Sequence, residues 1–149
     1  MNALDVLYVE DEETDIFIMQ HAFKKAGIGD RLHAVKDGKE ALDYLAGNAP
    51  FNDRSRHPLP GLMLLDLKLP YLSGFEVLAW VRQQQHLKRL PVLICSSSSR
   101  PDDIARSYDA GANGYILKPN TLSQFEALTL ALRDYWFLHN RPPEIAPAN

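Results

Sequence analysis

Reactive side chains stand at the ends of successive apolar runs in this sequence. The pair Glu10-Asp11 follows the first run, Asp66 ends the third, Ser96 ends the fourth and Lys118 follows the fifth. Each has an ordinary alternative role, since Asp11 can cap a helix, Asp66 can begin a turn and Lys118 can be a surface charge. If the runs are parallel strands, however, all of them lie at the sheet edge where open α/β sheets bind ligands.

Three carboxylates, those of Glu10, Asp11 and Asp66, would then be close together. Their repulsion would raise at least one pKa unless a cation lies among them. Oxygen ligands without His or Cys favour Mg²⁺ or Mn²⁺. Lys118 and Ser96 would supply a positive charge and a hydroxyl donor to a phosphoryl group. Asp66, on the central strand, is the expected nucleophile, and its attack on phosphorus would give an acyl phosphate.

Composition narrows the class of protein. The chain has 149 residues, of which 46% are hydrophobic, as expected of one folded domain. Its net charge of −3 provides no cationic field for nucleic acid or an anionic membrane. Cys95 is the only cysteine, which excludes an intrachain disulfide and fits a reducing compartment. Without a basic leader or an apolar run of about 18 residues, the chain is expected to be cytoplasmic.

Five segments are predicted strands. Four are apolar without alternation, as in strands buried on both faces, and one is polar enough for a sheet edge. The apolar segments are residues 4–9, 62–65, 92–95 and 115–117, and the edge strand is 31–35.

Amphipathic patterns predict five helices among these strands. They span residues 16–26, 39–45, 75–85 and 101–110, with a last helix from the capping box Thr121-x-x-Gln124. This last helix is expected to bury one stripe, Phe125, Leu128, Leu132 and Tyr135. Strict alternation of strands and helices predicts a doubly wound, five-stranded parallel α/β sheet.

Residues 1–140 are expected to form the domain. Residues 47–61 contain three prolines, are too long for an ordinary connection, and are interpreted as an insertion that forms a surface loop. Residues 141–149 are expected to be a flexible tail.

The consecutive aromatics Tyr135-Trp136-Phe137 suggest an interface. Consecutive helical residues point about 100° apart, so one core cannot bury all three. With Tyr135 on the core stripe, Trp136 and Phe137 are expected to point away from the sheet and to form a homodimer contact through the last helix.

The sequence resembles the receiver domains of two-component response regulators over residues 4 to about 138. The motifs that carry the resemblance are Val9-Glu10-Asp11-Glu12, Leu64-Leu65-Asp66-Leu67-Lys68-Leu69-Pro70, Gly74, Pro91-Val92-Leu93-Ile94-Cys95-Ser96 and Ala110-Gly111-Ala112-Asn113-Gly114-Tyr115-Ile116-Leu117-Lys118-Pro119. The resemblance implies a flavodoxin-like fold with strand order 2-1-3-4-5. It also implies a signalling protein, not an enzyme, that accepts a phosphoryl group from a histidine kinase.

The resemblance assigns roles to individual residues. Asp66 is implied as the phosphoacceptor, with Mg²⁺ held by Asp11, Asp66 and the backbone carbonyl of Lys68, while Glu10 acts through water. Ser96 and Tyr115 are implied as the switch pair. Lys118 is implied to contact the phosphoryl group and to precede a cis bond to Pro119.

Two site residues depart from the usual receiver pattern. Glu10 replaces the commoner Asp, which moves its carboxylate outward by one methylene. Ser96 replaces the usual Thr and lacks the β-branch that restricts χ1.

A narrower similarity concerns the class of regulator and its partner. The insertion at 47–61 and the long last helix are similar to stand-alone regulators associated with bacterial phytochromes, which implies a light-sensing histidine kinase, a bacteriophytochrome, as partner.

Three other functions compete with this interpretation, and the sequence counts against two of them. Glu10 and Ser96 favour a pseudo-receiver that binds partners constitutively. An aspartyl-phosphate phosphohydrolase would have an acid where Lys68 stands. A flavin-binding domain would need a phosphate-binding loop where this chain has four consecutive acids.

Overall fold

Five short strands form a parallel sheet in the order β2-β1-β3-β4-β5, which confirms the predicted order. The computed structural model describes residues 4–147. The strands are β1 (Val6–Val9), β2 (Leu32–Val35), β3 (Leu62–Leu65), β4 (Val92–Ser96) and β5 (Gly114–Leu117). The three inner strands are buried along their whole length, whereas β2 and β5, at the edges, are only partly buried.

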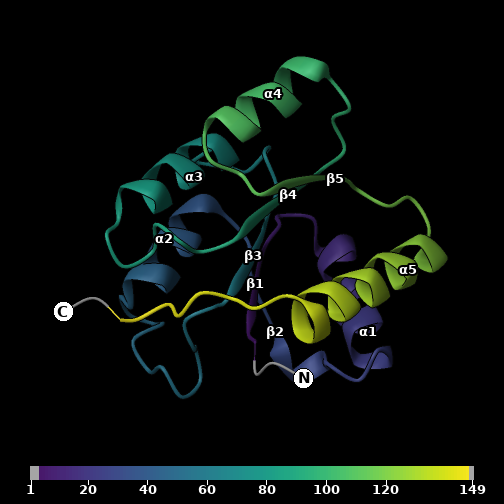
Figure 1. Ribbon diagram of the computed structural model, residues 1–149, viewed down its shortest axis with the longest axis horizontal. Helices are drawn as coiled ribbons and strands as arrows, with labels where there is room; N and C mark the ends of the chain where they lie inside the picture. Colours follow the sequence, from purple (N-terminus) through teal and green to yellow (C-terminus); the bar gives the residue numbers. More distant parts are fainter. Residues whose placement is uncertain (1–3, 148–149) are drawn as a thin grey trace.

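Helices cover both faces of this sheet, as the continuous apolar strands predict (Figure 1). Helices α1 (Glu13–Lys25) and α5 (Leu122–Leu132) pack together on one face. Helices α2 (Gly38–Ala46), α3 (Gly74–Gln83) and α4 (Pro101–Asp109) lie on the other. None of the helices within residues 4–147 combines the length and the apolar character that a membrane crossing requires.

Helix ends follow the signals in the sequence. Gly27 has φ +82°, which a residue with a side chain adopts only at a cost, and it follows the last turn of α1. Pro101 is the first residue of α4. The Thr121 hydroxyl accepts a hydrogen bond from the Gln124 amide at 3.2 Å, so the predicted cap of α5 is formed.

The stripe predicted for the last helix is wrong in its final turns. Tyr135, expected in the core, is 53% exposed, and Phe137, expected to point away, is 1% exposed. The reason is a change of helical period: residues Arg133–His139 form a π-helix, whose wider turns place Phe137 on the same face as Leu132, five residues earlier. Trp136 is partly buried against the core between α1 and α5.

The insertion at 47–61 is fixed to the end of α2. The Arg54 guanidinium donates to the carbonyls of Tyr44 at 2.7 Å and Leu45 at 3.0 Å. In return, the Tyr44 hydroxyl donates to the carbonyl of Pro58 at 2.9 Å. The loop therefore satisfies the last carbonyls of α2, which no residue within the helix can pair.

Residues 141–147 run without helix or strand toward the side of the sheet that carries α2 (Figure 1). Pro142 and Pro143 lie beside the segments Leu4–Asp5 and Leu59–Gly61, and Ile145 packs against the core beneath α2 and α3. The flexibility expected of this tail stays a prediction, and residues 148–149 lie outside the described part of the chain.

Candidate metal and phosphoacceptor site

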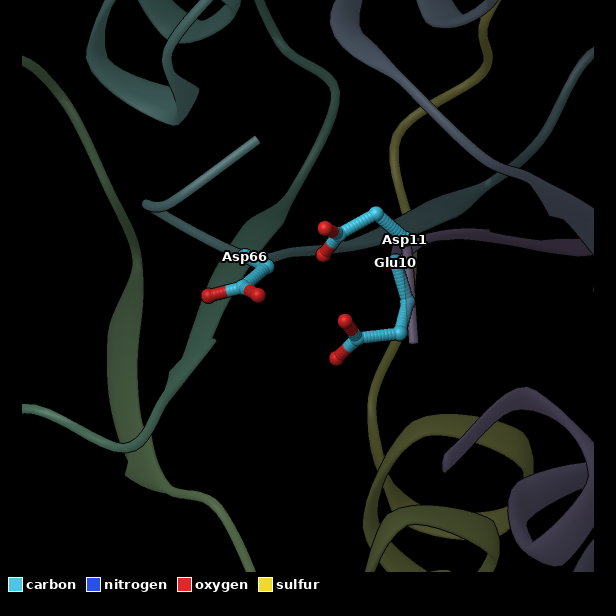
Figure 2. A group of neighbouring side chains, drawn as sticks. All are labelled: Glu10, Asp11 and Asp66. Carbon is cyan, nitrogen blue, oxygen red and sulfur yellow. The ribbon is translucent and has the colours of Figure 1, made fainter. Parts of the chain in front are cut away.

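Three carboxylates converge at the carboxyl end of the two central strands. Val9 and Leu65 pair across β1 and β3, so the residues that follow them, Glu10 and Asp66, leave the sheet at the same level. Carboxylate oxygens of Glu10, Asp11 and Asp66 all lie within 4.8 Å of one another. Figure 2 shows the three groups directed into a common space. The sequence prediction that these acids lie together is therefore met.

The three carboxylates differ in burial. Glu10 is fully buried and Asp66 is 5% exposed, whereas Asp11 is exposed. Glu10 accepts a hydrogen bond from the Glu12 amide at 3.1 Å and a longer one from the Tyr8 hydroxyl at 3.4 Å. Burial raises the pKa of Glu10 to about 7. The hydrogen bond from Lys118 lowers this pKa but does not cancel the effect of burial, and the charge of Asp66 raises it further. A buried acid beside two others favours a bound cation.

Lys118 supplies one positive charge to this group. Its Nζ lies 2.6 Å from Glu10 Oε1, 3.2 Å from Asp15 Oδ2 and 3.4 Å from Asp66 Oδ2. Burial lowers the pKa of Lys118, but the hydrogen bond with Glu10 and the charges of Asp66 and Glu10 outweigh burial and raise the pKa above its ordinary value. The lysine is therefore protonated at any physiological pH.

Asp15 is a site residue that the sequence reasoning missed. It lies in the first turn of α1, where an acidic side chain has an ordinary explanation in the helix dipole. The available signal was its position, because a helix that starts directly after β1 places its first turn at the same sheet edge as Glu10 and Asp11.

Ser96 and Tyr115 are linked through a third residue, Ser98, that was also missed. Ser96 ends β4 and is 1% exposed, and its hydroxyl accepts a hydrogen bond from the Ser98 amide at 3.2 Å. The Tyr115 hydroxyl donates to the Ser98 carbonyl at 2.8 Å. Ser98 also donates its own hydroxyl to Asp103 Oδ2, at 2.6 Å, in the first turn of α4. One residue thus connects the hydroxyl, the aromatic ring and α4.

The loop that follows Asp66 folds back closely over this residue. The Lys68 amide donates to Asp66 Oδ1 at 3.4 Å, and the Gly74 amide donates to the Leu67 carbonyl at 2.8 Å. A Cβ on Gly74 would lie 2.2 Å from the Asp66 carbonyl oxygen, so only glycine fits there. A cavity of about 250 Å³ opens beside this loop, lined in part by Lys68, Ser96 and Ser98.

The peptide bond between Lys118 and Pro119 is not in the isomer that the resemblance implies. The cis bond implied by the resemblance is wrong for this structure, because Ala49–Pro50 is the one cis bond within residues 4–147. Trans is the more stable isomer of an X-Pro bond. The Lys118 amide donates to the Ser96 carbonyl at 2.7 Å and thereby continues the pairing of β5 with β4. Lys118 thus contacts Glu10, Asp15 and Asp66 with its bond to Pro119 in the trans form.

The donor set fits a hard divalent cation. Within the described residues, the one group of three or more acidic, histidine or cysteine side chains with this spacing is Glu10, Asp11 and Asp66. It contains only oxygen donors, which suits Mg²⁺ or Mn²⁺. Cys95 is buried in β4, and burial raises the pKa of its thiol to about 12, so it is unsuited to hold a metal as a thiolate.

Comparison with known proteins assigns the family. Residues 6–129 match the model of the response regulator receiver domain. The chain is 33% identical over 138 residues to the probable methanogenesis regulatory protein FilR2 of Methanothrix harundinacea, covering 93% of this chain and 86% of that protein. It is also 33% identical over 131 residues to the response regulator Rcp1 of Synechocystis, covering 88% of this chain and 87% of Rcp1.

Solved structures agree in fold. The phosphorylated cyanobacterial phytochrome response regulator RcpA superposes with a TM-score of 0.87 at 34% identity, covering 96% of this chain and all of RcpA. The Mn²⁺-bound form of Rcp1 gives a TM-score of 0.84 at 31% identity, covering 95% of this chain and 99% of that one. Receiver domains are signalling proteins and not classical enzymes. The chain belongs to the response regulator receiver domain family, and its close relatives include phytochrome response regulators of the Rcp1 and RcpA type.

Proposed function

We propose that this protein is a phosphorylation-driven signalling switch that accepts a phosphoryl group on Asp66 from the phosphohistidine of a sensor kinase. The observation that carries the proposal is the convergence of the buried Asp66 carboxylate, the ammonium of Lys118 and two further acids at one sheet edge. Asp11, Asp66 and the Lys68 backbone carbonyl would hold Mg²⁺, or Mn²⁺, with Glu10 acting through water. The Mn²⁺-bound form of Rcp1 supports this choice of ion.

The residues of the chain perform distinct parts of the transfer. An Asp66 carboxylate oxygen attacks phosphorus while the bond from phosphorus to the donor imidazole nitrogen breaks, and the nitrogen keeps the electron pair. A bound divalent ion supplies positive charge to the phosphoryl oxygens. Lys118 donates to one phosphoryl oxygen and the Ser96 hydroxyl donates to another. Later attack by water returns Asp66 to its free form, slowly, as suits a signal and not a catalytic cycle.

The signal would leave the site through Ser98. When the Ser96 hydroxyl turns to the phosphoryl group, its contact with the Ser98 amide changes. Because Ser98 also accepts from Tyr115 and donates to Asp103, the change reaches both β5 and α4. Partner proteins would then distinguish the two states by the surface that these elements form.

The partners follow from the relatives. The relatives RcpA and Rcp1 support a light-sensing histidine kinase, such as a bacteriophytochrome, as the phosphodonor. We also propose that the protein acts in the cytoplasm, where the phosphodonor domain of that kinase would lie. We also propose a homodimer through the last helix. The exposed large apolar residues of this helix are Leu122, Leu130, Tyr135 and Leu138, and the last two, at its carboxyl end, replace Trp136 and Phe137 as the expected contact.

Intact-mass measurement tests the proposed function. The protein is incubated with acetyl phosphate and Mg²⁺, and one phosphoryl adduct is expected that is absent with EDTA and absent in Asp66→Asn. An adduct that persists in Asp66→Asn would place the acceptor elsewhere. No adduct with small donors or with any histidine kinase would instead support the constitutive pseudo-receiver.

A further inference from the structure

Asp15 contacts the lysine of the site from outside the group of three acids. Its Oδ2 lies 3.2 Å from Lys118 Nζ, and its side chain is 23% exposed. The other two partners of Lys118, Glu10 and Asp66, belong to the group whose oxygens lie within 4.8 Å of one another. We propose that Asp15 is a positioning residue, which holds the Lys118 ammonium beside Asp66 when a divalent cation is held by Asp11 and Asp66, with Glu10 acting through water.

The proposal rests on the proposed function and on competition between two cations. A divalent ion among the acids and the ammonium of Lys118 would draw on the same two carboxylates, Glu10 and Asp66, and would repel each other. The Lys118 side chain is only 13% exposed, so an ammonium that loses both partners would be left poorly solvated. Asp15 is the remaining carboxylate within contact distance of Lys118 in the described structure.

Geometry gives Asp15 a second effect. Lysine has a flexible stem and three N–H donors, so one donor on Asp15 leaves two for the phosphoryl oxygens. Without Asp15, the amine would be drawn to Glu10, already its nearest partner at 2.6 Å. In that position Lys118 opposes entry of the metal ion and is turned away from the phosphoryl group.

The test is a double-mutant cycle on metal affinity. Mn²⁺ binding is followed through the electron paramagnetic resonance signal of the free ion for Asp15→Asn, with native Lys118 and with Lys118→Ala. The matched control is Glu13→Gln, which removes an acid from the same turn of α1; the Glu13 side chain is 80% exposed and pairs with Lys36 at 3.1 Å. Thermal unfolding establishes that each variant is folded.

Asp15→Asn is expected to weaken Mn²⁺ binding about five- to tenfold when Lys118 is present, a size typical of coupling between contacting residues. With Lys118→Ala, the same substitution is expected to change affinity by no more than about twofold, as for a screened charge. An equally large effect without Lys118 would overturn the proposal, because Asp15 would then act on the ion directly. An effect no larger than that of Glu13→Gln with native Lys118 would also overturn it.

Phosphorylation at saturating Mg²⁺ provides the second readout. Asp15→Asn is expected to slow phosphorylation by acetyl phosphate, and Asp15→Glu, which keeps the charge, is expected to restore part of the rate. An equal rate in Asp15→Asn and the native protein would overturn the proposal. If the native protein is not phosphorylated at all, the proposed function fails, whereas the Mn²⁺ cycle still decides whether Asp15 positions Lys118.

Discussion

Lys118 Nζ lies 2.6 Å from Oε1 of Glu10, closer than to either of its other two carboxylate partners. Glu10 is fully buried, so the lysine provides a positive charge where the site would otherwise hold only acids. A metal ion bound among the acids would compete with this amine for Glu10, so substitution of Lys118 is expected to change metal affinity.

Lys118→Ala should separate metal binding from phosphorylation. Removing the amine frees Glu10 and Asp66, so Mn²⁺ affinity is expected to stay the same or to rise by up to about tenfold. Phosphorylation is expected to slow, because the positive charge that Lys118 would place beside the phosphoryl oxygens is removed. Calorimetric titration and intact-mass kinetics measure the two effects. A large loss of metal affinity would contradict the role assigned to Lys118.

Ser96→Ala should leave phosphorylation possible and weaken its effect on Tyr115. The hydroxyl that accepts from the Ser98 amide is removed, and with it the donor that follows the phosphoryl group. Tyr115 ring resonances, compared with and without beryllofluoride as a phosphoryl mimic, report the switch. Ser96→Thr is the matched variant, since its β-branch restricts χ1 and should strengthen the response. Equal responses in all three proteins would rule out this route.

The convergence of the site could be predicted from sequence because it depends on topology alone. Parallel strands end at one edge, so Glu10, Asp66 and Ser96 are brought together by any correct prediction of the strands and their order. The last helix could not be predicted in the same way. The spacing of Leu132, Tyr135 and Phe137 was interpreted with an α-helical period, and nothing in the composition of the segment marks the change to a π-helix.

Local contacts in the site were missed for a different reason. Asp15 and Ser98 are common residue types at a helix start and in a loop, where each has an ordinary role. Their importance appears only when β5 brings Lys118 and Tyr115 against them.

Gly74→Ala should distort the loop that follows Asp66. The added Cβ would lie 2.2 Å from the Asp66 carbonyl oxygen and 2.7 Å from Leu67 Cα, and backbone cannot move aside without displacing Asp66. The free energy of unfolding is expected to fall by about 1–3 kcal/mol, the usual cost of overpacking. Phosphorylation of Asp66 should slow as well. Urea unfolding and intact-mass kinetics measure both effects.

Gly27→Ala is the comparison for this substitution. Gly27 has φ +82° and nothing within 4 Å of an added Cβ, so the variant carries backbone strain without a clash near the site. It should be destabilised and still be phosphorylated at the native rate. If Gly74→Ala were phosphorylated as fast as Gly27→Ala, the close approach of Gly74 to Asp66 would have no part in forming the site.

Self-association is expected to depend on the exposed side of the last helix. Tyr135 and Leu138 are 53% and 46% exposed at the end of the chain's longest helical segment. Large aromatic and aliphatic side chains of this kind stabilise interfaces, because they bury much area at low cost in conformational entropy. Sedimentation velocity at several concentrations, with and without beryllofluoride and Mg²⁺, is expected to show a dimer that Tyr135→Ala combined with Leu138→Ala weakens at least about tenfold.

The control for this prediction is Tyr108→Ala. Tyr108 is 52% exposed on α4, so the substitution removes the same ring at the same exposure from a different surface. Phe137→Ala is unsuitable, because Phe137 is 1% exposed and its truncation would cost about 3–5 kcal/mol of stability. A dimer weakened equally by Tyr108→Ala would place the contact on α4. A monomer at every concentration would contradict the homodimer. Tyr135 and Leu138 would then be interpreted as a docking surface for the kinase or a target, because exposed apolar patches mark interaction sites.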